Sequence, residues 1–185
     1  MYRNQFNNTD LSGQTGNIIR WESSTDNFTT DTDIANTTTT LTATNLTTTT
    51  QYRAIVQSGA CTEATSATAT ITVDPTSVGG SIAGSTNVCT GTNSTTLTLS
   101  GQTGNIIRWE SSTDNFTTDT DIANTTTTLT ATNLTTTTQY RAIVQSGACT
   151  EATSATATIT VDPTSVEEVL REVPMCTGTN STTLT

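Results

Sequence analysis

An exact internal repeat constrains the fold of this chain more than any other feature. Residues 11–78 are identical, residue for residue, to residues 99–166, so the repeat has a period of 88 residues. A second identity, CTGTNSTTLT, joins residues 89–98 to residues 176–185 at an offset of 87 residues. This period is too long for a solenoid unit, and it suits one whole β-sandwich domain per repeat. The sequence therefore predicts tandem β-sandwich domains.

The composition agrees with an all-β chain. Threonine accounts for 54 of the 185 residues, whereas charged residues make up only 12%. Threonine is β-branched and favours strands, where it can cover a solvent-facing surface. A mucin-like stalk is the rival interpretation of so much threonine, but the chain contains only three prolines, and such stalks are rich in proline. We therefore expect strands with polar outer faces.

The net charge of −10, with no lysine and no histidine, excludes several classes of partner. Nucleic-acid binding requires a basic surface, and anionic membranes attract basic segments. We therefore predict no nucleic-acid partner. No apolar run approaches ~18 residues, so we also predict no membrane insertion. Residues 1–10 lack the apolar core of a signal peptide, so any secretion signal is expected to be removed or to lie outside this sequence.

Four short motifs in the complete repeat carry a family resemblance. They are Cys-x-Gly-x-Asn at 89–93, Arg-Trp-Glu-Ser-Ser at 108–112, Tyr-Arg-Ala at 140–142 and Ile-Thr-Val-Asp-Pro at 159–163. Together they resemble the immunoglobulin-like repeats of very large surface proteins and adhesins from Bacteroidetes, over nearly all of residues 11–185. The resemblance implies an all-β fold of tandem immunoglobulin-like β-sandwich repeats, an extracellular or cell-surface location, and a structural or adhesive role. It also implies aromatic core residues, namely Trp21, Tyr52, Trp109 and Tyr140.

The cysteines depart from the antibody pattern, because Ala142 and not a cysteine lies two residues after Tyr140. Within the complete repeat, Cys89 and Cys149 are 60 residues apart, and we predict that they form a disulfide. Such a bridge implies an oxidising compartment. Free buried thiols are the alternative. Zinc binding is disfavoured because the chain has neither a Cys-x-x-Cys pair nor a histidine.

The same cysteine spacing predicts an incomplete first domain. Position 1, where the partner of Cys61 is expected, holds Met1, and a partner for Cys176 would lie beyond residue 185. The predicted organisation is an atypical N-terminal segment, a repeat without its opening strand, a complete repeat, and a spacer followed by an opening strand, at 1–10, 11–78, 79–166 and 167–185.

This organisation leads to a hypothesis of head-to-tail strand complementation, in which copies of the chain are partners of one another. The opening strand of one copy would complete the first domain of the next, and Cys176 would bond to Cys61 between chains. A contact of this kind is heterologous, so it produces an open filament unless it closes into a ring. Two alternatives stay open: the chain folds back on itself, or it is a fragment of a longer array.

Catalysis and cofactor binding are not expected. Without histidine or lysine, the chain lacks the commonest acid–base residue and the serine–lysine pair, so we predict that it is not an enzyme and has no cofactor. Four carboxylates with Asp-x-Asp spacing are weak candidates for calcium ligands, but solvated loop acids are commoner and we predict no metal. These four are Asp31, Asp33, Asp119 and Asp121.

Alternating threonines suggest a second function. Thr126, Thr128 and Thr130 alternate along one segment, and Thr156, Thr158 and Thr160 along another. A flat array of outward threonines can bind ice or a regular carbohydrate surface, so a surface glycan is the alternative partner. The simpler interpretation is that threonine covers the solvent-facing positions of ordinary strands.

Overall fold

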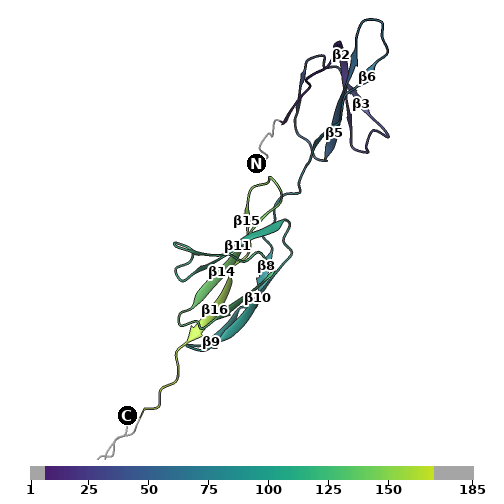
Figure 1. The fold of residues 1–185 in the computed structure, drawn as a ribbon. Helices are drawn as coiled ribbons and strands as arrows, with labels where there is room; N and C mark the ends of the chain where they lie inside the picture. Colours follow the sequence, from purple (N-terminus) through teal and green to yellow (C-terminus); the bar gives the residue numbers. More distant parts are fainter. Residues whose placement is uncertain (1–6, 169–185) are drawn as a thin grey trace, which may run out of the picture.

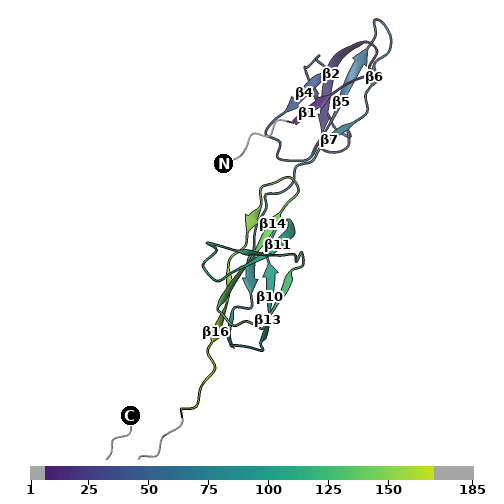
Figure 2. The ribbon, with the colours of Figure 1, turned by 60° about the vertical axis from the view of Figure 1, so that its left-hand side comes forward.

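The computed structural model describes residues 7–168 as two β-sandwich domains placed end to end (Figures 1 and 2). The first domain contains β1 to β7 and the second contains β8 to β16. The prediction of an all-β chain of tandem sandwiches is therefore confirmed. No helix within the described residues is long and apolar enough to cross a membrane.

The second domain packs a three-stranded sheet against a six-stranded sheet. The smaller sheet has the order β13-β10-β8, and the larger one has the order β12-β11-β14-β16-β9, with β15 paired to β14. The strands are β8 (Ser81–Ala83), β9 (Thr86–Cys89), β10 (Ser94–Ser100), β11 (Asn105–Ser112), β12 (Thr120–Ile122), β13 (Thr128–Thr132), β14 (Thr138–Gln145), β15 (Ala152–Thr153) and β16 (Ala157–Asp162).

The first domain repeats this arrangement with fewer strands. A two-stranded sheet, β1-β4, faces a sheet of order β3-β2-β5-β6, in which β7 also pairs with β5. The strands are β1 (Asn7–Asp10), β2 (Asn17–Ser24), β3 (Thr32–Ile34), β4 (Thr40–Ala43), β5 (Thr50–Gln57), β6 (Ala64–Thr65) and β7 (Ala69–Ile71). These seven strands correspond in order to β10 to β16 without β8 and β9.

Each domain has its own core, centred on a tryptophan of its larger sheet. Trp21 is 2% exposed and Trp109 is fully buried, and Tyr52 and Tyr140 lie beside them. The indole Nε1 of Trp109 donates a hydrogen bond to the carbonyl of Thr126 at 3.0 Å. The apolar ring is therefore buried while its one polar atom is satisfied.

The opening-strand position of the first domain is occupied by the N-terminal segment of the same chain. Strand β1 pairs with β4 and places Thr9 opposite Leu41, and this is the register in which β10 places Leu97 opposite Leu129. The prediction that the first domain lacks its opening strand is therefore wrong. Strand pairing uses backbone groups, which Asn7–Asp10 supply as well as β10 does with its two leucines.

The real difference between the domains is a pair of strands that cover the second one. Strand β8 pairs with β10, and β9 runs parallel to β16 with Cys89 opposite Asp162. No strand of the described residues takes these two positions in the first domain. As a consequence Ile159 is fully buried in the second domain, whereas the identical Ile71 is only half-buried.

Candidate functional site: the junction between repeats

The linker, Asp74–Val78, connects the domains and docks on the hairpin loop, Ser146–Cys149, that joins β14 to β15. The Ser77 hydroxyl accepts a hydrogen bond from the Ser146 amide at 2.9 Å, and the Asp74 carboxylate accepts one from the Ala148 amide at 3.1 Å. Val78 and Thr103 exchange two backbone hydrogen bonds of 2.9 and 3.1 Å. The junction is therefore a specific contact and not a free tether.

Two glycines allow the backbones to approach closely at this junction. A Cβ atom on Gly147 would lie 1.9 Å from the Asp74 carboxylate, and φ at Gly147 is +48°. A Cβ atom on Gly79 would lie 2.0 Å from the carbonyl oxygen of Thr153. Because any side chain at these positions would collide, the docked geometry depends on glycine at both.

Both halves of this junction occur a second time in the chain. Residues 162–166 are identical in sequence to the linker, and residues 58–61 are identical to the hairpin loop. Ser146 is 6% exposed within the formed junction, whereas the equivalent Ser58 is exposed. The loop 58–61 follows β5 at the end of the first domain that points away from the second, and residues 162–166 leave the opposite end of the molecule (Figure 1).

A groove runs along the first domain where β8 and β9 would cover it. One part, of about 500 Å³, is lined by residues 9–15 and 64–69 and reaches the core at Trp21 and Tyr52. Another part, of about 460 Å³, lies between residues 7–9 and 69–72 and is bordered by Ala148 of the second domain. The outer edge of β7 therefore offers backbone donors and acceptors next to apolar core surface, which is the situation of an unpaired sheet edge.

The cysteines are not placed as the sequence predicted. Cys61, Cys89 and Cys149 are all free. Cys89 pairs with Asp162 at the lower end of the second domain in Figure 1, whereas Cys149 contacts the linker at the upper end. Between these ends runs β14, whose eight residues span over ~20 Å at ~3.3 Å per residue.

The predicted bridge between Cys89 and Cys149 is therefore wrong, because disulfides need Cα atoms within ~7 Å. The second predicted disulfide, between Cys61 of one chain and Cys176 of another, depends on the same 60-residue spacing. Cys176 lies outside the described residues, so that pairing is not tested directly, but the argument for it is lost.

Cys149 instead lies in the junction. Its Sγ atom is 3.3 Å from the carbonyl oxygen of Pro75 and 3.7 Å from that of Asp74. Cys149 is half-buried there, whereas the equivalent Cys61 is exposed. The hairpin cysteine of one repeat thus contacts the linker that follows the previous repeat.

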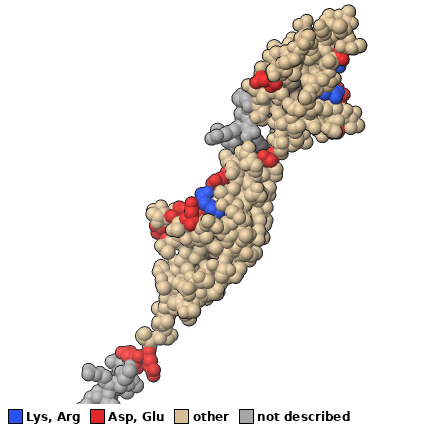
Figure 3. Space-filling view, viewed as in Figure 1, with Lys and Arg blue, Asp and Glu red and all other residues tan. Residues whose placement is uncertain are grey.

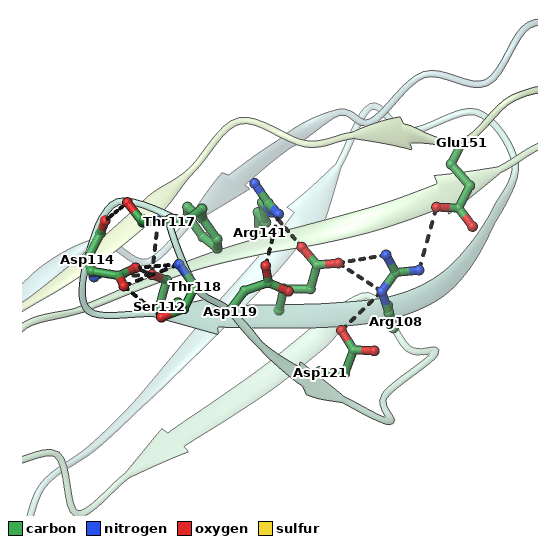
Figure 4. A network of polar contacts seen from close by, with 11 residues as sticks. Arg108, Ser112, Asp114, Thr117, Thr118, Asp119, Asp121, Arg141 and Glu151 are labelled. Carbon is green, nitrogen blue, oxygen red and sulfur yellow. Dashed lines mark hydrogen bonds and ion pairs between the residues drawn. The ribbon is translucent and has the colours of Figure 1, made fainter.

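A network of ion pairs crosses the outer face of the larger sheet in each domain. In the second domain, the buried carboxylate of Glu110 pairs with Arg108 at 2.7 Å and with Arg141. Arg108 also pairs with Asp121 at 3.2 Å, and Arg141 lies 3.8 Å from Asp119 (Figure 4). Figure 3 shows this as a blue patch flanked by red, and most of the surrounding surface in this view is uncharged.

This network accounts for the four aspartates that were weak candidates for calcium binding. The carboxylates of Glu110, Asp119 and Asp121 lie within 4.8 Å of one another, as do those of Glu22, Asp31 and Asp33. A cation there would compete with the guanidinium groups that already pair with these clusters. The absence of a metal stays a prediction.

Hydrogen bonds control the pKa values on this face. Burial raises the pKa of Glu22, but the hydrogen bonds from Arg53 and Arg20 outweigh burial, so its pKa lies below the ordinary value. The pKa of Asp114 falls to about 2 because its carboxylate accepts hydrogen bonds from the Thr118 hydroxyl and amide and from the Ser112 hydroxyl. The equivalent Asp26 behaves in the same way, again to about 2.

One of the two predicted threonine ladders lies on an exposed face of the smaller sheet. Thr128 and Thr130 on β13 lie directly opposite Thr98 and Thr96 on β10, and all four are exposed. On β16, Thr158 and Thr160 are half-buried. The threonine face is therefore built from two neighbouring strands, β10 and β13, whereas the predicted ladder includes none of the threonines of β10.

The contact between the linker and the hairpin loop is not predicted by the sequence. Their signal was present, because Asp-Pro-Thr-Ser-Val and Ser-Gly-Ala-Cys each occur twice, at 74–78 and 162–166 and at 58–61 and 146–149. Identity alone does not tell which segments touch, since that depends on how one domain stacks on the next.

Comparisons with known proteins supply a family and distant structural likenesses. No curated protein sequence matches the chain. The crystal structure of chicken CNTN1 FN1–FN3 domains is 14% identical, with a TM-score of 0.40, and the match covers 89% of this chain and 65% of that one. The two fibronectin type-III domain segment from chicken tenascin is 14% identical, with a TM-score of 0.34, and covers 80% of this chain and 85% of that one.

At these TM-scores the likenesses carry no argument about function, and the chain spans 65% of the CNTN1 segment. The family match is more direct. A profile for a domain of unknown function matches residues 2–75 and again residues 78–163. The first match includes β1, in agreement with its place in the first sandwich. The chain therefore belongs to the DUF8696 family of domains of unknown function and carries two consecutive copies of the domain.

Proposed function

We propose that this chain is a structural unit of an extracellular or cell-surface array, an adhesin or a filament, whose copies join head to tail. The observation that carries the proposal is the repeated junction. One complete junction lies between the two domains, and its two halves recur in exposed form at the opposite ends of the molecule.

The contacts of the formed junction define those expected between copies. Ser165 and Asp162 of one copy would accept hydrogen bonds from the Ser58 and Ala60 amides of the next, as Ser77 and Asp74 do within the chain. Val166 would pair with Thr15, as Val78 pairs with Thr103. Because the two halves lie at different ends of the molecule, the contact is heterologous and leads to a chain of copies.

The open edge of β7 supplies further contact area. In the second domain this edge is covered by β9 in parallel register. If the segment that follows residue 166 of one copy paired with this edge in the next, its backbone hydrogen bonds would add affinity there. Strand complementation therefore belongs to the proposal, but at the position of β8 and β9 and not beside β4.

The match between the two junctions ends after Val166. Glu167 stands where the first junction has Gly79, and a Cβ atom at Gly79 would lie 2.0 Å from a carbonyl oxygen. The segment after Val166 must therefore leave the path that Gly79 follows before it reaches the open edge. The proposal depends on the docked residues 162–166 and treats the added strand as reinforcement.

Sedimentation velocity of the full chain under reducing conditions tests this association. We expect the average sedimentation coefficient to rise with protein concentration. Gly59→Asn should abolish the rise, because its side chain would collide with the Asp162 carboxylate of the preceding copy, as a Cβ atom at Gly147 would with Asp74. In the free domain, a Cβ atom on Gly59 meets nothing within 4 Å, and asparagine tolerates a positive φ.

Gly147→Asn is the matched control, since it makes the same change in the same local sequence but at the internal junction. This variant should still associate, because its two outer halves are intact. A wild-type chain that stays monomeric at its highest soluble concentration, or a Gly59→Asn variant that associates normally, would contradict the proposal.

A second candidate function is binding of a glycan or ice surface by the threonine face. The observation in its favour is that Thr96, Thr98, Thr128 and Thr130 form two facing pairs on one exposed sheet. Glycan-array binding and ice recrystallisation assays with the full chain and with Thr98→Lys/Thr130→Lys test it. Equal behaviour of both proteins would exclude this face as the binding surface.

A further inference from the structure

In the two repeats, one cysteine lies beside the linker residue Asp74 and another lies beside the equivalent residue, Asp162. Within the chain, the hairpin cysteine of the second repeat, Cys149, places its Sγ atom 3.7 Å from the carbonyl oxygen of Asp74. The residue equivalent to Asp74 in the second domain is Asp162. There the strand β9 places Cys89 directly opposite Asp162, and the next amide, that of Thr90, donates to the Asp162 carbonyl at 2.9 Å.

Asp74 and Asp162 are equivalent positions of the two repeats and lie in the same local sequence. A hairpin cysteine that docks below the second domain would contact the carbonyl of Asp162 as Cys149 contacts that of Asp74. That carbonyl is already bonded to the residue next to Cys89. With Cys61 of the next copy docked in this way, Cys61 and Cys89 would both flank Asp162, and a disulfide requires their Cα atoms to lie ~4.4–6.8 Å apart.

We propose that the junction between copies is closed by a disulfide between Cys89 of one copy and Cys61 of the next. This inference rests on the head-to-tail association proposed above. It replaces the bridge within a repeat by a bridge between repeats, from the strand cysteine of one repeat to the hairpin cysteine of the following one. Cys89 and Cys61 are both exposed and free in the single chain, so both are accessible to the reaction.

The reaction requires an oxidant, and a small-molecule disulfide such as glutathione disulfide serves. The thiolate of one cysteine attacks the oxidant and forms a mixed disulfide, and the thiolate of the second cysteine displaces the remaining glutathione. The protein thiols lose two electrons and two protons, and the oxidant leaves as two glutathione thiols. Such bonds persist in the extracellular compartment that the proposed function implies.

An intrachain bond between the same two residues is excluded by their positions. Cys61 lies in the loop after β5, at the outer end of the first domain, and Cys89 ends β9 at the outer end of the second domain (Figure 1). A bond between them must therefore join two copies. It also leaves Cys149 inside the formed internal junction, where it contacts Pro75.

Two full-length variants test the bond. One retains Cys61 and Cys89 (C149S/C176S), and its matched control retains Cys89 and Cys149 (C61S/C176S). After treatment with glutathione disulfide, we expect a ladder of reducible multimers on a non-reducing gel for the first variant and monomer for the control. The difference should be on the order of tenfold or more, because docking holds the two thiols at a high effective concentration.

Peptide mapping identifies the bond. Cleavage after Arg53, Glu63 and Arg108 separates Cys61, in residues 54–63, from Cys89, in residues 64–108, so the bridged pair has a unique mass. Circular dichroism of both variants verifies that they fold. Sedimentation velocity in reducing buffer, run in parallel, measures association without the disulfide. It therefore tests the head-to-tail association separately from the bond.

Association without a ladder overturns the disulfide and leaves the proposed function standing. If there is neither association nor a ladder, both proposals are overturned. Equal ladders in both variants overturn the specific pairing, because they would report random collisions of exposed thiols.

Discussion

At the scale of single residues, a buried carboxylate organises the outer face of each domain. Glu110 is 2% exposed and accepts ion pairs from Arg108 and Arg141, and Arg141 also stacks 4.0 Å above the ring centroid of Phe116. A buried charge is tolerated only when it is paired and hydrogen-bonded. Glu110 therefore fixes two arginines and, through them, the loop that carries Phe116.

Substitution of this residue gives a first prediction at the residue scale. Glu110→Ala should destabilise the second domain by about 2–4 kcal/mol, because two half-buried guanidinium groups lose the buried carboxylate that they share. The control Asp119→Ala removes a partly exposed partner of the same network and should cost less than about 1 kcal/mol. Urea denaturation followed by tryptophan fluorescence measures both. Equal effects of the two changes would show that Glu110 is not the centre of the network.

Single residues also determine how the free energy of unfolding changes at low pH. The pKa values of Asp26 and Asp114 lie at about 2 in the folded chain, below ~3.9 for a free aspartate. Their contribution to stability is therefore complete above pH ~4 and is lost as the pH falls through about 2. The free energy of unfolding should decline across this window, and Asp26→Asn/Asp114→Asn should reduce the decline. An unchanged pH profile in the double variant would refute this assignment.

At the scale of elements, β9 makes one copy of the repeat more stable than the other. Ala157 and Ile159 on β16 are fully buried under β8 and β9, whereas Ala69 and Ile71 on β7 remain half-buried. The two sequences are identical over this region, so the difference arises only from what covers them. The first domain should therefore unfold first.

A matched pair of substitutions tests this difference between elements. Ile159→Ala should cost about 2–5 kcal/mol, the usual range for truncation of a fully buried isoleucine. Ile71→Ala, in the same local sequence, should cost no more than about half as much, since its side chain is already partly exposed to water. Chemical denaturation under reducing conditions, at a protein concentration at which the chain is monomeric, compares them. Equal costs would indicate that the edge of β7 is covered in solution.

Much of the element pattern was predictable from alternation of apolar and polar residues. Leu97 and Leu99, and Tyr140, Ala142 and Val144, face the core as expected. Apolar and polar residues also alternate from residue 153 to residue 161, which by itself would predict one unbroken strand. The structure instead divides it into β15 and β16, because the Ser154 hydroxyl accepts a hydrogen bond from the Ala142 amide and redirects the backbone.

At the scale of the whole molecule, the two sandwiches stack end to end through a small contact with few hydrogen bonds (Figure 2). Such a contact holds a preferred orientation within one chain, where the linker keeps both halves together. Between copies the same contact must also offset the loss of translational and rotational freedom. The added strand and the proposed disulfide are therefore what would convert a weak association into a durable array.

The orientation of the domains should depend on the Asp74 carboxylate. Asp74→Ala removes the hydrogen bond to the Ala148 amide, worth about 0.5–3 kcal/mol when one partner is charged. We expect a broader range of inter-domain angles, seen as a broader distance distribution in small-angle X-ray scattering. Asp162→Ala, the equivalent change outside the internal junction, is the control and should leave the distribution of the monomer unchanged. Identical distributions for both variants would mean that other contacts hold the junction.

The sequence by itself determined the number of domains, their all-β class and most of their core, because period, alternation and residue type act locally and identically in both copies. It did not determine which segment pairs with β4, where the cysteines lie, or how one repeat meets the next. Strand pairing depends on backbone groups that every residue carries, so Asn7–Asp10 can take the place of an apolar strand. The separation of Cys89 from Cys149 depends on strand order. Only the tertiary structure decides these features, because each is a relation between residues far apart in the chain.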